Sequence, residues 1–539
     1  MKHVKQLQQR LVRTCAAAKP SYLAQVMRPS HTAGAMAAAD RRIDTSLELI
    51  SEADKSPCDR RSRALMQQRL PLRLGGSGVD SAAATAAPRW VASVARSWAD
   101  LRVWIPRLAD IDIATSTLPF FREFRSCYDD LRRRRADVET FHLALTSAAG
   151  AYFDFDGETR VPFLPKGLPP ASALPSDVSA FANRRPKTSE VCDPSMHKLP
   201  AQRSLCSVVH HEAWVRLQQL CAQSDSMAAA AGSATMIARE CSRLTSTGAE
   251  YAGAWLDVLP TSWLQKSSKF AVGLQRRLGL YISAAAAHFD AVAAEGDTVT
   301  ESDRLGDSFA HAANHSTAHK WMVVAWRNAE AATTLGTVYM GDKKKGKEHY
   351  SVYCATYVPD VIKLDGGDDG RPELDEIKNY SPFVHPATSH PACTSLVGGL
   401  YAFGNTEERL KHKVLGSRRR GVPSAGRFNH KDGSGFVPAA EGDYRDALNN
   451  RKACVHLLVH ETLGGFSPYA ARRLRRLGRL ATENGVDATD YTRSYTAHSF
   501  VPYYSQSICS ACVMHGADGI LKGIRKASHS RLRAAAGHA

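Results

Sequence analysis

Two carboxylates and a lysine are spaced so that they would share one face of a β-hairpin. They lie in the stretch YVPDVIKLDGGDDGRPELDEIKNY, Tyr357 to Tyr380, whose Gly-Gly-Asp-Asp-Gly run is typical of a tight turn. If the turn is centred on residue 368, opposed residues of the antiparallel pair have an index sum of about 736. Asp360 then faces Glu376, and Lys378 follows on the same face because side chains alternate along a strand.

This arrangement predicts a catalytic site that binds a cation. Directly opposed carboxylates repel each other, and a cation between them would relieve the repulsion. Oxygen ligands favour Mg²⁺ or Mn²⁺, and Val358, Ile362 and Leu374 on the same face would shield the site from water. Lys378 would orient a water molecule or stabilise charge developing on a phosphate. The alternative is an exposed acidic turn in which Lys378 is only a salt-bridge partner. The other carboxylates of the segment would be replaceable turn residues: Asp365, Asp368 and Asp369.

The chain around this segment is strongly basic. Its 539 residues include 70 Lys and Arg against 53 Asp and Glu, which gives a formal net charge of +17. Arginines occur in runs at 132–135, 418–420 and 472–479. Although each single run could be a solvated helix face, the total charge favours a polyanionic partner, and we expect nucleic acid, DNA in particular.

The composition also argues against a membrane protein and a secreted protein. No window approaches about 18 uninterrupted apolar residues, so we expect no transmembrane helix and no membrane partner. The N-terminus is basic but lacks the apolar core of a secretory signal. The 12 cysteines are scattered without a framework spacing, which indicates reduced thiols. We therefore expect an intracellular protein, located in the nucleus.

Composition shifts divide the chain into five expected segments. They are a mainly helical basic region at 1–150, a proline-rich linker at 151–205, a helical region at 206–295, the catalytic unit at 300–480 and a C-terminal helical segment at 481–539. The predicted fold class is α/β with large all-α parts.

Within the catalytic unit, hydrophobic periodicity predicts the order helix, three strands, helix, strand. The expected elements are the helix at 314–336, strands at 337–340, 350–364 and 373–380, the helix at 405–416 and the strand at 453–460. The order of the core is therefore α-β-β-β-α-β, with the Asp360–Glu376 hairpin at its centre.

Pro359-Asp360 followed by Glu376-Ile377-Lys378 on the next strand resembles the PD-(D/E)xK signature of restriction-endonuclease-like nucleases, whose core has the same α-β-β-β-α-β order. Four other stretches resemble the region downstream of the polymerase in non-LTR retrotransposons that carry such a nuclease: 69–83, 254–280, 461–481 and 499–513. The resemblance covers residues from about 65 to 530 in patches. It implies a nuclease that nicks target DNA to prime reverse transcription. It also implies that Asp360, Glu376 and Lys378 are catalytic, and that Asp360 and Glu376 bind the metal ion.

The chain departs from that family in two respects. It has no polymerase Asp-Asp motif, so it looks like the C-terminal part of such an element without its reverse transcriptase. The stretch that matches the family's zinc knuckle, 284–315, keeps several histidines but has no cysteine. These departures leave a second hypothesis open, namely a decayed retroelement fragment that binds nucleic acid without catalysis.

Several other residues are weaker candidates. His311, His315 and His319 are four apart, so a helix would align them either as zinc ligands or as a polar, phosphate-facing edge. Glu330 could be an additional acidic metal ligand. The basic residues expected to contact phosphates are Lys343, Lys344, Lys345, Lys347, Arg472, Arg473, Arg475 and Arg476.

Two pairs of residues are expected to serve packing. Cys509 and Cys512 form a Cys-x-x-Cys on a predicted helix, where small side chains at this spacing suit close packing better than redox chemistry or zinc binding. Trp321 and Trp326 are expected in the core.

Overall fold

The computed structural model describes most of the chain. The residues that it describes are 4–149, 152–153, 159–160, 167–182, 200–230, 239–257, 267–310, 314–333, 338–340, 358–364, 371–381, 444, 447–448, 453–485 and 496–537. They are mainly helical and include a four-stranded mixed sheet, which confirms the predicted α/β class with large all-α parts. None of the described helices is long and apolar enough to cross a bilayer.

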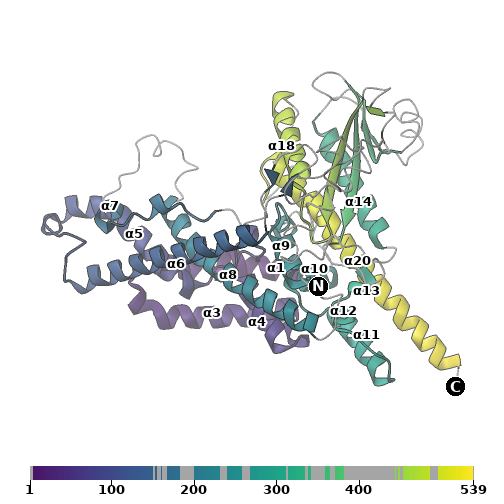
Figure 1. Ribbon diagram of the computed structural model, residues 1–539, viewed down its shortest axis with the longest axis horizontal. Coiled ribbons are helices and arrows are strands. Elements are labelled where there is room, and N and C mark those ends of the chain that lie inside the picture. Colours follow the sequence, from purple (N-terminus) through teal and green to yellow (C-terminus); the bar gives the residue numbers. More distant parts are fainter. Residues whose placement is uncertain are drawn as a thin grey trace, which may run out of the picture.

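The N-terminal half of the chain contributes a helical arm that extends to one side of the molecule (Figure 1). Its helices are α3 (Pro29–Ser51), α4 (Cys58–Gln68), α5 (Ala82–Trp104), α6 (Pro119–Ala149), α7 (Val178–Ala182) and α8 (Pro200–Ala230). The outer part of the arm has its own core, in which Trp90 of α5 packs edge-on against Phe124 of α6, and Tyr128 packs against Phe181 of α7. Strands β1 (Tyr152–Phe153) and β2 (Thr159–Arg160) form a separate antiparallel pair.

The remaining helices and the sheet form the body of the molecule, crossed by the long helix α20 (Figure 1). The helices of this part are α1 (Val4–Leu11), α9 (Arg239–Gly248), α10 (Ser267–Leu278), α11 (Ser283–Ala294), α12 (Glu301–Arg304), α13 (Asp307–Ala310), α14 (Asn314–Ala331), α18 (Pro468–Glu483) and α20 (Phe500–Gly537). Helix α2 (Ala18–Val26) packs instead against α3 and α5 of the arm. One hydrophobic core joins α10, α14, α18 and α20 to the sheet and also reaches Ala64 of α4. This core therefore runs across the segment boundaries expected at 295–300 and 480.

The sheet has the strand order β3 (Val338–Met340), β4 (Val361–Lys363), β5 (Glu373–Tyr380) and β6 (Cys454–Glu461). Strands β3 and β4 pair antiparallel, as do β4 and β5, whereas β6 is parallel to β5. Val361 pairs with Asp375 and Lys363 pairs with Glu373, so the predicted hairpin register is confirmed. The predicted turn at 365–370 and the predicted helix at 405–416 lie outside the described residues.

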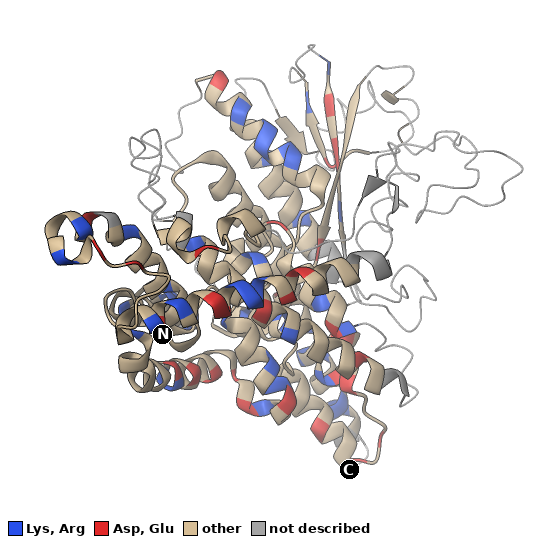
Figure 2. Cartoon of the chain, turned by 60° about the vertical axis from the view of Figure 1, so that its left-hand side comes forward, with Lys and Arg blue, Asp and Glu red and all other residues tan. Residues whose placement is uncertain are grey.

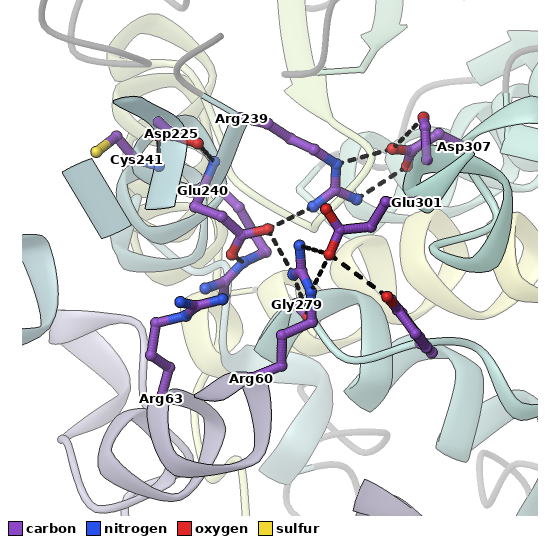
Figure 3. Close-up of polar contacts among 12 residues, drawn as sticks. Arg60, Arg63, Asp225, Arg239, Glu240, Cys241, Gly279, Glu301 and Asp307 are labelled. Atoms are coloured by element: carbon purple, nitrogen blue, oxygen red, sulfur yellow. Dashed lines mark hydrogen bonds and ion pairs between the residues drawn. The ribbon is translucent and has the colours of Figure 1, made fainter. Parts of the chain in front are cut away.

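A buried carboxylate, Glu240, holds the arm and the body together (Figure 3). Its two oxygens accept hydrogen bonds from Arg60 of α4 at 3.1 Å, from Arg239 at 2.8 Å and from Arg243 at 2.8 Å. Arg239 also pairs with Asp307 of α13, and Arg60 pairs with Glu301 of α12. We call this set of six residues, three arginines and three carboxylates, the arginine hub.

The hub needs a glycine at its edge. The carbonyl oxygen of Gly279 accepts a hydrogen bond from Arg60 at 2.9 Å, and its φ of +69° lies in the left-handed region. A Cβ atom here would lie 2.6 Å from Nε of Arg243 and 2.7 Å from the Glu240 carboxylate. Asp225 of α8 completes the arrangement, because its carboxylate accepts the backbone N–H groups of Glu240 and Cys241 at the start of α9.

Segments that are far apart in the sequence meet beside the hub. Arg277 of α10 donates hydrogen bonds to the backbone carbonyls of Gly76, Thr247 and Ala252, at 2.9 to 3.0 Å. Residues of the stretches 254–280, 461–481 and 499–513 also share the main core, including Phe270, Leu474 and Ile508. These three stretches, which are far apart in the sequence, therefore pack together in one core.

The close approach at Gly76 makes a specific prediction about stability. A Cβ atom at Gly76 would collide with the backbone carbonyl oxygens of Leu70 and Gln67, neither of which can move without shifting the chain. We expect Gly76→Ala to lower the free energy of unfolding by about 2 kcal/mol or more. Gly34, inside α3, has nothing within 4 Å of such an atom. Gly34→Ala should therefore raise the free energy of unfolding by about 0.5–1 kcal/mol. Thermal and urea unfolding would measure both, and equal effects of the two variants would contradict the packing described here.

Candidate active site

The two faces of the central hairpin carry different chemistry. Ile362 and Leu374 lie on the face that packs against Tyr444 and a small apolar cluster. Because opposed residues share a face and side chains alternate, Asp360, Glu376 and Lys378 belong to this face. The opposite face, which carries Val361 and Ile377, is covered by α14 and α18 and belongs to the main core. Glu376 and Lys378 thus lie across the sheet from the main core, whereas Asp360, just before β4, also contacts His319 of α14.

Asp360 lies immediately before β4 and is held from two sides. Its backbone N–H donates to the carbonyl of Asp375 at 3.0 Å, which extends the hairpin ladder by one step. One carboxylate oxygen accepts the backbone N–H of Ile377 at 2.8 Å, and the other lies 3.1 Å from Nε2 of His319 on α14. The carboxylate is therefore fixed against β5 and against the helix that precedes the sheet.

Glu376 is buried and its two oxygens have different partners. The hydroxyl of Tyr444 donates to one oxygen at 2.6 Å, and Lys378 forms an ion pair with the other. The Glu376 side chain is 2% exposed, whereas Lys378 is 28% exposed. The lysine therefore reaches from the buried carboxylate toward solvent, where a substrate could meet it.

The electrostatics of the site agree with two carboxylates in close proximity. Burial, followed by the negative charge of Asp360, raises the pKa of Glu376, while Lys378 and Tyr444 oppose the shift. The hydrogen bond to Asp360 raises the pKa of His319. Each carboxylate thus has one nearby basic side chain, Lys378 for Glu376 and His319 for Asp360, and this partly offsets their mutual repulsion.

The donor set fits a hard divalent cation only in part. Among the described residues, no group of three or more His, Cys, Asp or Glu side chains could by itself hold a metal ion. Asp360 and Glu376 nevertheless offer two carboxylates to one site, and Mg²⁺ is commonly held by one or two carboxylates, with water and substrate phosphates completing its shell. The pair is therefore compatible with an ion that binds together with a phosphate substrate.

The face under α14 and α18 holds a buried ion-pair network. Arg473 of α18 donates to Glu330 of α14 at 2.7 Å and to Glu373 of β5 at 2.7 Å, and Lys363 lies 3.4 Å from Glu330. Burial opposes ionisation of Glu373, but hydrogen bonds from His456 and Arg473 hold its pKa below the ordinary value. This network joins both covering helices to the sheet.

Two sequence predictions are corrected by this network. Arg473 was predicted to contact phosphates, but its side chain is 2% exposed and its guanidinium is engaged inside the protein. Glu330 was predicted to be an additional metal ligand. It is fully buried against Arg473 and Lys363, on the sheet face opposite Glu376, and has no path to the candidate site.

The other basic candidates have different surroundings. Arg472 and Arg475 are exposed on α18, where Arg475 pairs with Glu250, and Arg476 is half-buried. Figure 2 shows the basic residues of α18 beside the strands. The predicted phosphate-binding lysines lie outside the described residues: Lys343, Lys344, Lys345 and Lys347. The arginine run at 132–135 is paired within the protein, with Asp129, Asp130, Glu139 and Glu212.

The remaining candidates divide between core and surface. Cys509 and Cys512 are buried, and burial raises the pKa of Cys509 to about 12, in agreement with a packing role. Trp326 is buried in the main core as predicted, but Trp321 is 47% exposed, so its prediction as a core residue was wrong. His311 lies outside the described residues, and His319 contacts Asp360.

The contacts of His319 and Tyr444 with the carboxylates were missed by sequence reasoning. His319 was considered for zinc or phosphate because of its helical spacing, and its position on the helix before the sheet was the available signal. Tyr444 lies 68 residues from Glu376 in a segment without a recognisable pattern, so no sequence signal indicated it. No protein-family model matches the chain, and a search of curated proteins gives no significant match.

The buried network predicts a sharp difference between two adjacent arginines. Replacing Arg473 by Ala would leave the buried Glu330 and Glu373 with Lys363 alone between them, and we expect a loss of about 3–5 kcal/mol in the free energy of unfolding. Arg472→Ala removes an exposed neighbour and should change it by about 0.5 kcal/mol or less. Urea unfolding of both variants measures the difference. Similar stability of the two proteins would show that the network does not form.

Proposed function

We propose that the chain is a metal-dependent DNA endonuclease, derived from a retrotransposon and built on a restriction-endonuclease-like core of α14, β3, β4, β5 and β6. The observation that carries the proposal is the register of β4 and β5. It gives Asp360, Glu376 and Lys378 one face of the sheet, in the order Pro-Asp and then Glu-x-Lys. The neighbouring His319 and Tyr444 hold the two carboxylates in fixed positions.

The reaction would be hydrolysis of a phosphodiester. A water molecule attacks the phosphorus atom, a P–O bond forms to it, and the bond to the leaving oxygen breaks. Asp360 and Glu376 would hold Mg²⁺ or Mn²⁺, which would stabilise negative charge on the phosphate. Lys378, paired with Glu376 and partly exposed, would donate hydrogen bonds to the attacking water or to a phosphate oxygen.

The excess of positive charge on the whole chain would attract a polyanionic substrate. Arg472 and Arg475 are exposed on α18, which covers the sheet face opposite Glu376 and Lys378, so they would contact DNA away from the reacting phosphate. Contacts of this kind bind phosphates without reading sequence, so we expect affinity for DNA to fall steeply as salt rises.

Nicking of supercoiled DNA in the presence of Mg²⁺ tests the proposal. We expect the wild-type protein to convert the plasmid to the relaxed form, and chelation of the metal to stop it. Glu376→Gln keeps the size of the side chain but removes its charge, and it should lower the rate by at least about 100-fold.

Asp368→Asn is the matched control, because it removes a carboxylate from the predicted turn of the same segment and should leave the rate unchanged. DNA binding by the wild type and Glu376→Gln without nicking by either would favour the alternative, a fragment that binds nucleic acid without catalysis. Equal nicking by the wild type and Glu376→Gln would show that the Glu376 carboxylate takes no part in catalysis.

A further inference from the structure

An aromatic pair, one ring of which is exposed, lies on the helices α14 and α20. Trp321 of α14 and His515 of α20 stack with their ring centroids 4.7 Å apart and their planes at 4°. Trp321 is 47% exposed. His515 covers one face of the indole ring, and nearly half of the side chain remains exposed.

The pair is close to the candidate site along both helices. On α14, Trp321 is two residues beyond His319, which contacts Asp360. On α20, His515 is three residues beyond Cys512, whose thiol lies 3.7 Å from the side-chain oxygen of Asn379, and Asn379 follows Lys378 directly on β5. Both rings therefore stand within one helical turn of residues that touch the catalytic strands or Asp360.

The surroundings of the pair are basic. Lys269 of α10 and Lys522 of α20 both pair with Asp518, at 3.0 and 2.9 Å, and both act electrostatically on His515. Lys320, next to Trp321, is exposed. Two lysines for one aspartate leave a positive charge beside the aromatic rings, and Lys320 adds to it.

The side of α20 that carries His515 is charged. Asp518, Lys522 and Arg525 follow His515 at helical spacing, and the two basic residues, Lys522 and Arg525, are exposed. Burial, followed by Lys269, lowers the pKa of His515 to about 4. The imidazole is therefore neutral at physiological pH and stacks as an uncharged ring.

We propose that Trp321, supported by His515, is a stacking platform for an unpaired nucleobase, with Lys320, Lys269 and Lys522 contacting the phosphates of the same strand. A neutral aromatic face beside lysines is the combination that binds single-stranded nucleic acid. Every base can stack on the aromatic ring, and every phosphodiester carries a negative charge that a lysine can contact. A purely apolar partner would leave the lysines without counter-charges. The inference rests on the proposed nucleic-acid partner but not on cleavage.

The platform lies beside the candidate site rather than in it. A strand seated there would run along α14 and α20, the helices whose residues His319 and Cys512 contact Asp360 and Asn379. The substrate class would then be DNA that is locally unpaired, or a duplex opened at the site of cutting.

The test measures binding of a labelled oligothymidine of about 12 nucleotides by fluorescence anisotropy. The buffer contains EDTA, so that no strand is cut. Trp321→Ala should weaken binding by about 10- to 100-fold, as expected for the loss of one stacked base. Trp321→Phe keeps an aromatic face and should recover most of the affinity. Lys522→Ala should weaken binding more at low salt than at high salt.

Trp104→Ala is the matched control, because Trp104 is 76% exposed at the end of α5 in the helical arm. It should bind like the wild type. Unchanged affinity of Trp321→Ala, an equal loss for Trp104→Ala, or an equal loss on duplex DNA of the same length would each overturn the platform.

The outcome is separable from that of the nicking assay. Binding that depends on Trp321 without nicking by the wild type would support the platform and reject the endonuclease. Nicking of duplex DNA by a wild-type protein that does not bind the oligothymidine would support the endonuclease and reject the platform. Thermal unfolding shows whether each variant is folded. If Trp321→Ala is unfolded, the binding affinity of Trp321→Phe is used to test the platform.

Discussion

Glu240 is the residue on which the assembly of the molecule depends most directly. A carboxylate that is 1% exposed would be costly to bury alone, and here it is surrounded by Arg60, Arg239 and Arg243. Desolvation opposes its ionisation, yet the three guanidinium groups hold the pKa of Glu240 well below the ordinary value. The charges on these arginines in turn require Glu301 and Asp307, which fixes the short helices α12 and α13.

The same principle governs the sheet. Strand β5 sends Glu373 and Asp375 to the face under α14 and α18, and Glu376 and Lys378 to the face of the candidate site. On the buried face Arg473 and Lys363 pair with Glu330 and Glu373, and burial, followed by repulsion from Glu330, raises the pKa of Asp375 well above the ordinary value. On the other face two carboxylates are left near each other with partly exposed cations. One strand therefore supplies both a structural and a chemically reactive set of charges.

The hairpin register could be predicted from the sequence because a glycine-rich turn fixes the pairing of both strands. The helices α14, α18 and α20 could also be predicted, since their apolar residues follow helical spacing. The burial of Arg473 could have been read from the same spacing, because Ala470, Leu474, Leu477 and Ala481 place it on the buried side of α18. The run of arginines around it suggested a surface role instead.

Other features could not be predicted, because each depends on a partner far away in the sequence. Trp321 and Trp326 are five residues apart on α14 and so face different directions, but only the assembled fold, in which Trp326 packs against His460 and Phe466, determines which of them is buried. The contact of His319 with Asp360 spans 41 residues, and that of Arg60 with Glu240 spans 180. Helical or strand periodicity says which face a side chain occupies, whereas the identity of its partner follows from the assembled fold.

The arginine hub also sets an order of events during synthesis. Arg60 is made 180 residues before Glu240 and 241 residues before Glu301. At about 5–20 residues per second, a ribosome needs roughly 10–50 s to add the residues between Arg60 and Glu301. Until Glu240 has been made, α4 carries a guanidinium group that no carboxylate of the hub can neutralise. The first segment to emerge therefore waits for a later one, and the body of the molecule closes only when the chain has passed α13.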